Sequence, residues 1–195
     1  MRIFVSWSGE RGRALGTAVR EFIPLIFQRA QVFTTADDID KGSRWSTVLR
    51  QELESVDTAI ICLTPESLNS PWLAFEAGAI LTRLGPSHIF VLAAGLSVAD
   101  VSGPLAAFQI SPVDRSSCQR LFEQLNRGSE PVLSESVLSR LFEAMWPSFD
   151  TQLQSLLSGS ERESKAVTAR PDRDLLEELV VEVRQLKKRM SEIDK

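Results

Sequence analysis

The sequence predicts an α/β fold of the flavodoxin-like type, with a five-stranded parallel sheet and helices on both faces. Short apolar runs alternate with longer segments whose apolar residues recur every three or four positions. This alternation is typical of strand–helix–strand units, which join parallel strands by right-handed crossovers. The run at residues 58–63 is apolar throughout, as expected for a central strand that is covered on both faces.

The expected elements follow from the same patterns. We expect strands at residues 3–7, 32–35, 58–63, 89–93 and 108–110, and helices at residues 11–29, 45–56, 70–84 and from about residue 115. Ser70 is a suitable N-cap for the helix at 70–84, and Pro71 suits its first turn. Sheets of this kind bind ligands beyond the carboxyl ends of their strands, so the loops after Trp7, Thr35 and Leu63 should surround any site.

The chain continues beyond this α/β domain, which we place at residues 1–135. Residues 136–157 predict a further helix that packs on the domain, and the polar residues 158–173 predict a flexible linker. Residues 174–195 predict an amphipathic helix. Its apolar residues alternate at intervals of three and four, as in a coiled-coil seam, so we expect it to make the protein oligomeric.

Composition excludes several classes of function. The net charge is -4, and no cluster of Lys and Arg precedes residue 184, so nucleic acid is not an expected partner. The two cysteines, Cys62 and Cys118, give no support to a disulfide framework or a zinc site, and we expect His88 to be structural. Without a signal-peptide pattern or an apolar stretch of about 18 residues, we expect a cytoplasmic protein with no membrane partner.

Three glycines, Gly9, Gly12 and Gly16, follow the first expected strand. Their spacing does not match the dinucleotide fingerprint G-x-G-x-x-G, and the phosphate-loop pattern is absent as well. The sequence therefore does not favour a Rossmann dehydrogenase or a P-loop NTPase. We interpret the glycines as permitting a tight turn and close packing of a helix.

Glu76 is the residue that best fits a catalytic role. The helix at 70–84 has one apolar stripe that includes Leu73, Ala77, Ile80, Leu81 and Leu84, and a second apolar surface at Trp72, Phe75 and Ala79. At 100° per residue, Glu76 points between the two, one turn from Trp72. A carboxylate beside an indole near the end of a strand suits a catalytic cleft. The alternative is a structural carboxylate that accepts a hydrogen bond from a loop amide.

The chain resembles bacterial Toll/interleukin-1 receptor (TIR) domains in three segments, which occur in the expected order and spacing: IFVSWSGE, VFTTADDIDKGSRW and TAIICLTPESLNSPWLAFEAGAI. The resemblance covers roughly residues 1–135. It implies a flavodoxin-like fold in which residues 36–44 form the BB loop, a contact loop for self-association. It also implies that SPWLAFEAG carries the catalytic glutamate of NAD-cleaving TIR domains, here Glu76, with Trp72 as the nearby aromatic residue.

The function implied by this resemblance is cleavage of the nicotinamide–ribose bond of NAD+, by hydrolysis or cyclisation. NAD+ is then the substrate, no separate cofactor is needed, and no metal is expected. The resemblance further implies activation by self-assembly, a role in bacterial immunity against phage, and a separate sensor protein as a further partner. The candidate substrate-binding residues are Trp7, Trp45 and Trp72 for stacking on a base, Arg44 for the pyrophosphate, and Ser8 and Asp37 in the loops that follow the first two strands.

Two other functions remain open on the sequence. A non-catalytic TIR domain that only assembles with other TIR domains would share the fold and the loop at 36–44 without needing Glu76. An enzyme similar to nucleoside deoxyribosyltransferases would also use a glutamate on a related α/β fold. A receiver domain is not favoured, because such domains carry an aspartate at the end of the third strand, where this chain has Leu63 and Thr64.

Overall fold

The computed structural model describes residues 1–34, 54–70, 73, 77, 78, 80, 81, 84, 85 and 88–158, all of which belong to the compact unit Met1–Ser164. Several predicted features lie outside the described residues. They are the loop at 36–44, most of the helix at 45–56, the linker at 158–173 apart from Ser158, and the amphipathic helix at 174–195.

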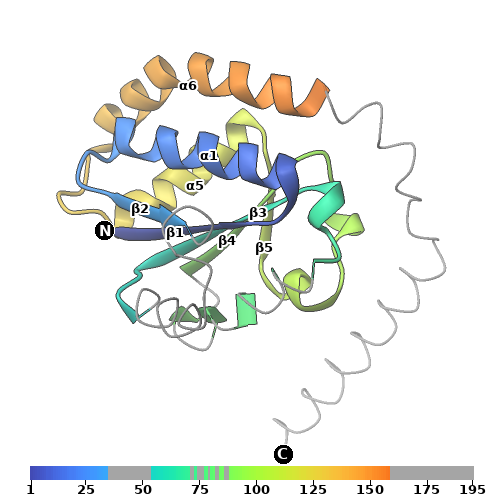
Figure 1. The fold of residues 1–195 in the computed structure, drawn as a ribbon. Coiled ribbons are helices and arrows are strands. Elements are labelled where there is room, and N and C mark those ends of the chain that lie inside the picture. Colours follow the sequence, from blue (N-terminus) through green and yellow to red (C-terminus); the bar gives the residue numbers. More distant parts are fainter. Residues whose placement is uncertain are drawn as a thin grey trace, which may run out of the picture. The chain divides into compact units, whose positions relative to one another are not determined.

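Five parallel strands form one sheet, as the sequence predicts. The strands are β1 (Arg2–Trp7), β2 (Gln31–Thr34), β3 (Thr58–Leu63), β4 (Ile89–Ala93) and β5 (Gln109–Pro112). Their order in the sheet is β2-β1-β3-β4-β5, and every neighbouring pair is parallel (Figure 1). This is the flavodoxin-like order, in which the chain changes direction across the sheet between β1 and β3.

Three long helices lie on one side of this sheet: α1 (Gly9–Ile26), α5 (Arg115–Arg127) and α6 (Glu135–Ser158). α1 and α5 pack on the strands, and α6 packs on α1 and α5, running beside α1 in Figure 1. Short 3-10 helices lie in the connections between strands. η1 (Pro65–Ser67) follows β3, and η3 (Val98–Asp100) and η4 (Gly103–Ala107) lie between β4 and β5. Within the described ranges, no helix is long and apolar enough to cross a membrane.

The core consists of two apolar layers, one on each face of the sheet. Alternate residues of β1, β3 and β4 enter opposite layers, because successive side chains of a strand point to opposite faces. The layer under α1, α5 and α6 takes Ile3, Val5, Trp7, Ile60, Cys62, Phe90 and Leu92 from the strands. The other layer takes Phe4, Ala59, Ile61, Leu63, Ile89 and Val91. Burial on both faces explains why the central strands have continuous apolar sequences.

Asp114 caps the N-terminus of α5. Its carboxylate accepts hydrogen bonds from the Ser117 N–H at 2.9 Å, the Ser117 hydroxyl at 2.9 Å and the Ser116 hydroxyl at 2.7 Å. Partial burial raises the pKa of Asp114, but these hydrogen bonds together outweigh burial and leave the pKa below its usual value. The cap therefore stabilises the ionised form of this carboxyl group.

Asp114→Ala is expected to lower the free energy of unfolding by about 1 kcal/mol at neutral pH, because the first turn of α5 loses its cap. Because the folded-state pKa is depressed, the ionisation-dependent part of this stabilisation is present above the unfolded pKa of about 3.9 and is lost as pH falls through the lower folded value. Urea denaturation at neutral and acidic pH measures both effects. Ser116→Ala removes one of the three bonds and is the matched control. Equal stability of Asp114→Ala and wild type would contradict the role of the cap.

Candidate functional site at the carboxyl edge of the sheet

The loops that follow β1 and β3 meet at the carboxyl edge of the sheet. The Ser70 hydroxyl donates to the Ser8 hydroxyl at 3.1 Å, and the Leu73 N–H donates to the Ser70 hydroxyl at 3.4 Å. Ser70 therefore caps the helix that follows η1, as the sequence predicts. The same side chain joins the start of that helix to the loop after β1, which brings the predicted site residue Ser8 beside it.

The helix after η1 turns its predicted apolar stripe to the core. Residues 73, 77, 78, 80, 81 and 84 are helical, and the side chains of Leu73, Ala77 and Ile80 are fully buried in the layer below β3 and β4. Leu84 packs partly against the same layer, whereas Leu81 is 36% exposed. The predicted stripe is confirmed at its centre, and Leu81 lies at its edge rather than within the core.

Glu66 is a residue of this edge that the sequence analysis missed. The Arg11 N–H donates to the Glu66 carboxylate at 2.6 Å, so Glu66 satisfies a free amide in the first turn of α1. Ser8, at the N-cap position, makes no capping bond of its own. Gly9 has φ +79, and a β-carbon there would collide with the Glu66 carboxylate. The sequence did carry a signal, because an acid just after the central strand lies on the same edge as the positive end of α1.

The turn that carries Glu66 is held by buried hydroxyl groups. The Thr64 N–H donates to the Ser67 hydroxyl at 2.9 Å, and the two hydroxyl groups lie 3.1 Å apart. The Ser67 hydroxyl also donates to the Thr64 carbonyl oxygen at 3.2 Å. Because both side chains are buried, these bonds fix the direction in which the chain leaves β3 and so fix where Glu66 lies.

Trp7 lies in a different environment from the one that its predicted role requires. Its side chain is 7% exposed and packs in the core layer beneath α1. A β-carbon on Gly16 would overlap the indole ring, and one on Gly12 would lie 3.4 Å from the Trp7 β-carbon. The face of the indole is therefore covered by α1 and is not open to a base, so stacking by Trp7 was wrong. The close helix packing that we expected of the glycines is confirmed.

The other predicted site residues lie outside the described residues: Glu76, Asp37, Arg44, Trp45 and Trp72. For this reason their positions remain predictions from the sequence.

Thiol and metal chemistry find no support at the described residues. Cys62 and Cys118 are free and buried, as expected for Cys62. Burial raises the pKa of the Cys62 thiol far above its usual value, and burial together with the Asp114 charge raises that of Cys118 to about 12. The His88 ring lies 3.1 Å from the Leu84 carbonyl oxygen at a helix end. Across the described ranges, no group of His, Cys, Asp and Glu is arranged to hold a metal ion.

Comparison with known families decides the assignment. A family model described as "TIR domain" matches residues 3–126, which is more than half of the chain. The chain belongs to the TIR domain family. The match runs from the second residue of β1 to the residue before the last of α5. It includes residues of every strand of the sheet, Ser8, Glu66 and the helix after η1.

Among solved structures, this TIR domain is similar to the TIR domains in a structure of the activated Roq1 resistosome directly recognizing the pathogen effector XopQ. The two chains are 13% identical, the match covers 93% of this chain and 98% of the other, and the TM-score is 0.39. The family assignment rests on the sequence match and not on this structural likeness. A comparison with curated proteins gave no match.

Proposed function

We propose that this TIR domain cleaves NAD+ at the nicotinamide–ribose bond, with Glu76 as the catalytic carboxylate. The observation that carries the proposal is the bonded pair Ser8 and Ser70 at the carboxyl edge of the sheet. Ser70 begins the helix on which the sequence places Glu76, at the edge where α/β sheets of this order bind ligands. Membership of the TIR family, and the similarity of SPWLAFEAG to the segment that carries the glutamate in NAD-cleaving members, support the same assignment.

The proposed reaction needs only one carboxylate. Ordinary glycosidases use a second carboxyl group to protonate a poor leaving group. In NAD+ the nicotinamide ring is cationic, so the electron pair of the breaking C1′–N bond neutralises it, and nicotinamide leaves without a proton. The remaining task is to orient the ribose and to stabilise the positive charge that develops at C1′. An ionised Glu76 would do both, by accepting hydrogen bonds from ribose hydroxyl groups and by facing C1′. Water then attacks C1′ in hydrolysis, and an adenine nitrogen attacks it in cyclisation.

The other substrate contacts in this proposal come from the loops around the same edge. Arg44 pairs with the pyrophosphate, since guanidinium groups bind phosphate oxygens in a bidentate manner. Trp45 and Trp72 stack on the bases, whereas Trp7 is removed from this set because α1 covers its ring. Ser8 and Asp37 complete the proposed contacts with NAD+.

The direct test is to incubate the purified full chain with NAD+ and to identify the products by chromatography and mass spectrometry. The proposal predicts release of free nicotinamide together with ADP-ribose or a cyclic isomer. A folded protein that leaves NAD+ intact at low and high protein concentration would favour the non-catalytic TIR domain. Transfer of the sugar of a deoxynucleoside to another base, in a parallel panel of nucleosides, would favour the deoxyribosyltransferase alternative.

We further propose that self-association activates the enzyme, through the loop at 36–44 and through the predicted helix at 174–195. A bacterial antiphage role, with a separate sensor protein as partner, belongs to the same proposal. In that helix, six apolar residues keep a seam of three- and four-residue intervals: Leu176, Leu179, Val183, Leu186, Met190 and Ile193. Association through this seam would raise the local concentration of TIR domains.

Leu179→Asp combined with Leu186→Asp is expected to reduce the oligomeric mass in light scattering, because both changes place charge in the predicted seam. The protein concentration needed for NAD+ cleavage should rise in the same variant. Gln185→Asp adds a charge outside the seam and is the control. A wild-type chain that stays monomeric at high concentration would contradict this part of the proposal.

A further inference from the structure

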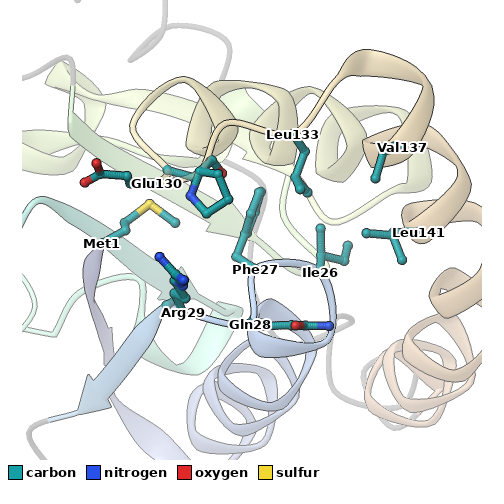
Figure 2. Close-up of a pocket in the computed structure, with 12 residues that line it drawn as sticks. Met1, Ile26, Phe27, Gln28, Arg29, Glu130, Leu133, Val137 and Leu141 are labelled. Carbon is teal, nitrogen blue, oxygen red and sulfur yellow. The ribbon is translucent and has the colours of Figure 1, made fainter.

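A pocket lies at the amino ends of the strands, at the opposite end of the sheet from Ser8 and Glu66. Its cavity volume is about 430 Å³, and it is formed by Met1, by the end of α1 and the turn that follows it, and by the α5–α6 connection with the first turns of α6 (Figure 2). Met1 directly precedes β1 and Ala30 directly precedes β2, which fixes the pocket at the amino ends of the strands. This volume is within the range of about 300–1,000 Å³ that is typical of small-molecule sites.

The walls of the pocket are held in place before any ligand binds. Asn126, which is buried, donates from its amide nitrogen to the Leu133 carbonyl oxygen at 2.8 Å and accepts from the Leu133 N–H at 2.9 Å. The buried Ser129 hydroxyl donates to the Asn126 carbonyl oxygen at 2.8 Å. On the opposite wall, the Phe27 ring stacks on Phe122, with centroids 5.7 Å apart and planes 9° apart. A preformed cavity of this kind reduces the entropy that a ligand must lose on binding.

The pocket has an apolar end and a charged end. Figure 2 shows Ile26, Leu133, Val137 and Leu141 together at one end, all of them apolar and at least partly buried. At the other end, around Met1, Figure 2 places Arg29 and Glu130, and both side chains are exposed at the rim.

The charged end offers one group of each sign. Among the described residues, neither the Arg29 guanidinium nor the Glu130 carboxylate has a hydrogen bond or an ion pair. α1 ends at this pocket without a basic residue in its last turn, so its carboxyl end contributes partial negative charge there. An anion is therefore attracted to Arg29, whereas a cation is attracted to Glu130 and to the end of α1.

We propose that this pocket binds a small zwitterion with an apolar side chain, of which an apolar α-amino acid is the simplest example. The ligand carboxylate pairs with Arg29, its ammonium group lies near Glu130 and the end of α1, and its side chain enters the apolar end beside Val137 and Leu141. Glu130 would repel a purely anionic ligand, and Arg29 would repel a purely cationic one. The site is separate from the proposed NAD+ site and does not depend on it.

The test is an NMR titration of the isotope-labelled full chain with L-phenylalanine and L-leucine. We expect saturable shifts of amides around the pocket, such as those of Gln28 and Ser129. The charged analogues 3-phenylpropanoate and 2-phenylethylamine each lack one ionic group. Each should bind more weakly than L-phenylalanine by up to about fivefold, as expected for the loss of one solvent-exposed ionic contact.

Three variants locate the contacts. Arg29→Gln should weaken L-phenylalanine and 3-phenylpropanoate but leave 2-phenylethylamine unchanged, and Glu130→Gln should have the opposite selectivity. Leu141→Arg should abolish binding of all ligands while the spectrum of the rest of the domain is retained. Arg127→Gln, an exposed change on α5 outside the pocket lining, is the control and should leave binding unchanged.

Several results would overturn the proposal, and none of them involves NAD+. They are the absence of saturable shifts with both amino acids at millimolar concentration, equal binding of the three phenyl ligands, and retained binding in a folded Leu141→Arg variant.

Discussion

Glu76→Gln is expected to reduce NAD+ cleavage by a hundredfold or more while the fold is retained. The substitution keeps the size of the side chain and removes its charge, so it tests electrostatic stabilisation of the developing positive charge at C1′. Loss of one such oriented charge costs about 3 kcal/mol or more of transition-state stabilisation, which corresponds to at least about a hundredfold in rate. The measurement is the rate of nicotinamide release at saturating NAD+, with circular dichroism to verify the fold.

Glu123→Gln is the matched control for this experiment. Glu123 lies on the exposed surface of α5, where it accepts a hydrogen bond from Gln119 at 3.3 Å, and its replacement makes the same chemical change away from the proposed site. We expect its NAD+ cleavage to equal that of the wild type. A folded Glu76→Gln variant with the wild-type rate would show that Glu76 is a structural acid, in agreement with the alternative that the sequence left open.

Trp7→Ala is expected to lower the free energy of unfolding by about 3–5 kcal/mol, since it removes a large buried ring and leaves a cavity under α1. Gly16→Ala should cost about 1–3 kcal/mol in the wild-type background, because its β-carbon would overlap the indole ring. Denaturant unfolding of the two single variants measures both values.

The double variant gives the sharper result. Without the indole, the β-carbon at position 16 has space, and alanine is a better helix former than glycine by about 0.5–1 kcal/mol. Gly16→Ala should therefore stabilise the Trp7→Ala protein although it destabilises the wild type. If Gly16→Ala has the same effect in both backgrounds, then the indole and α1 do not pack as described.

The fold could be predicted from the sequence where local pattern and burial agree. The runs at 58–63 and 89–93 are apolar on both faces of the sheet, and the bounds of β3 and β4 equal the predicted ones. The predicted bounds of the outer strands were less accurate. β5 was predicted at 108–110 and spans Gln109–Pro112, and none of its residues is fully buried. An edge strand has a partner on one side only, so its short sequence carries little periodic signal.

Features set by contacts between distant residues could not be predicted as well. The helix predicted at 11–29 begins at Gly9, because Glu66, more than fifty residues away, bonds the Arg11 amide in its first turn. The helix ends at Ile26, and the residues after it form the turn into β2. For Trp7, the sequence did carry the necessary signals. The residue shares a strand face with Ile3 and Val5, and Gly12 and Gly16 lie one helical turn apart, a spacing that opens a groove on α1.

Glu66 also has a consequence for how a dinucleotide can lie on this sheet. In many doubly wound proteins the pyrophosphate rests on the N-terminus of the helix after the first strand, where free amides and the helix dipole attract it. Here the carboxylate of Glu66 already accepts a hydrogen bond from the Arg11 N–H at 2.6 Å. A phosphate at that position would be repelled by the Glu66 carboxylate, and the Arg11 N–H would not be free to bind it. Under the proposed function, the phosphates of NAD+ would therefore be neutralised from another loop, and the TIR domain would hold the dinucleotide in an orientation unlike that of a dehydrogenase.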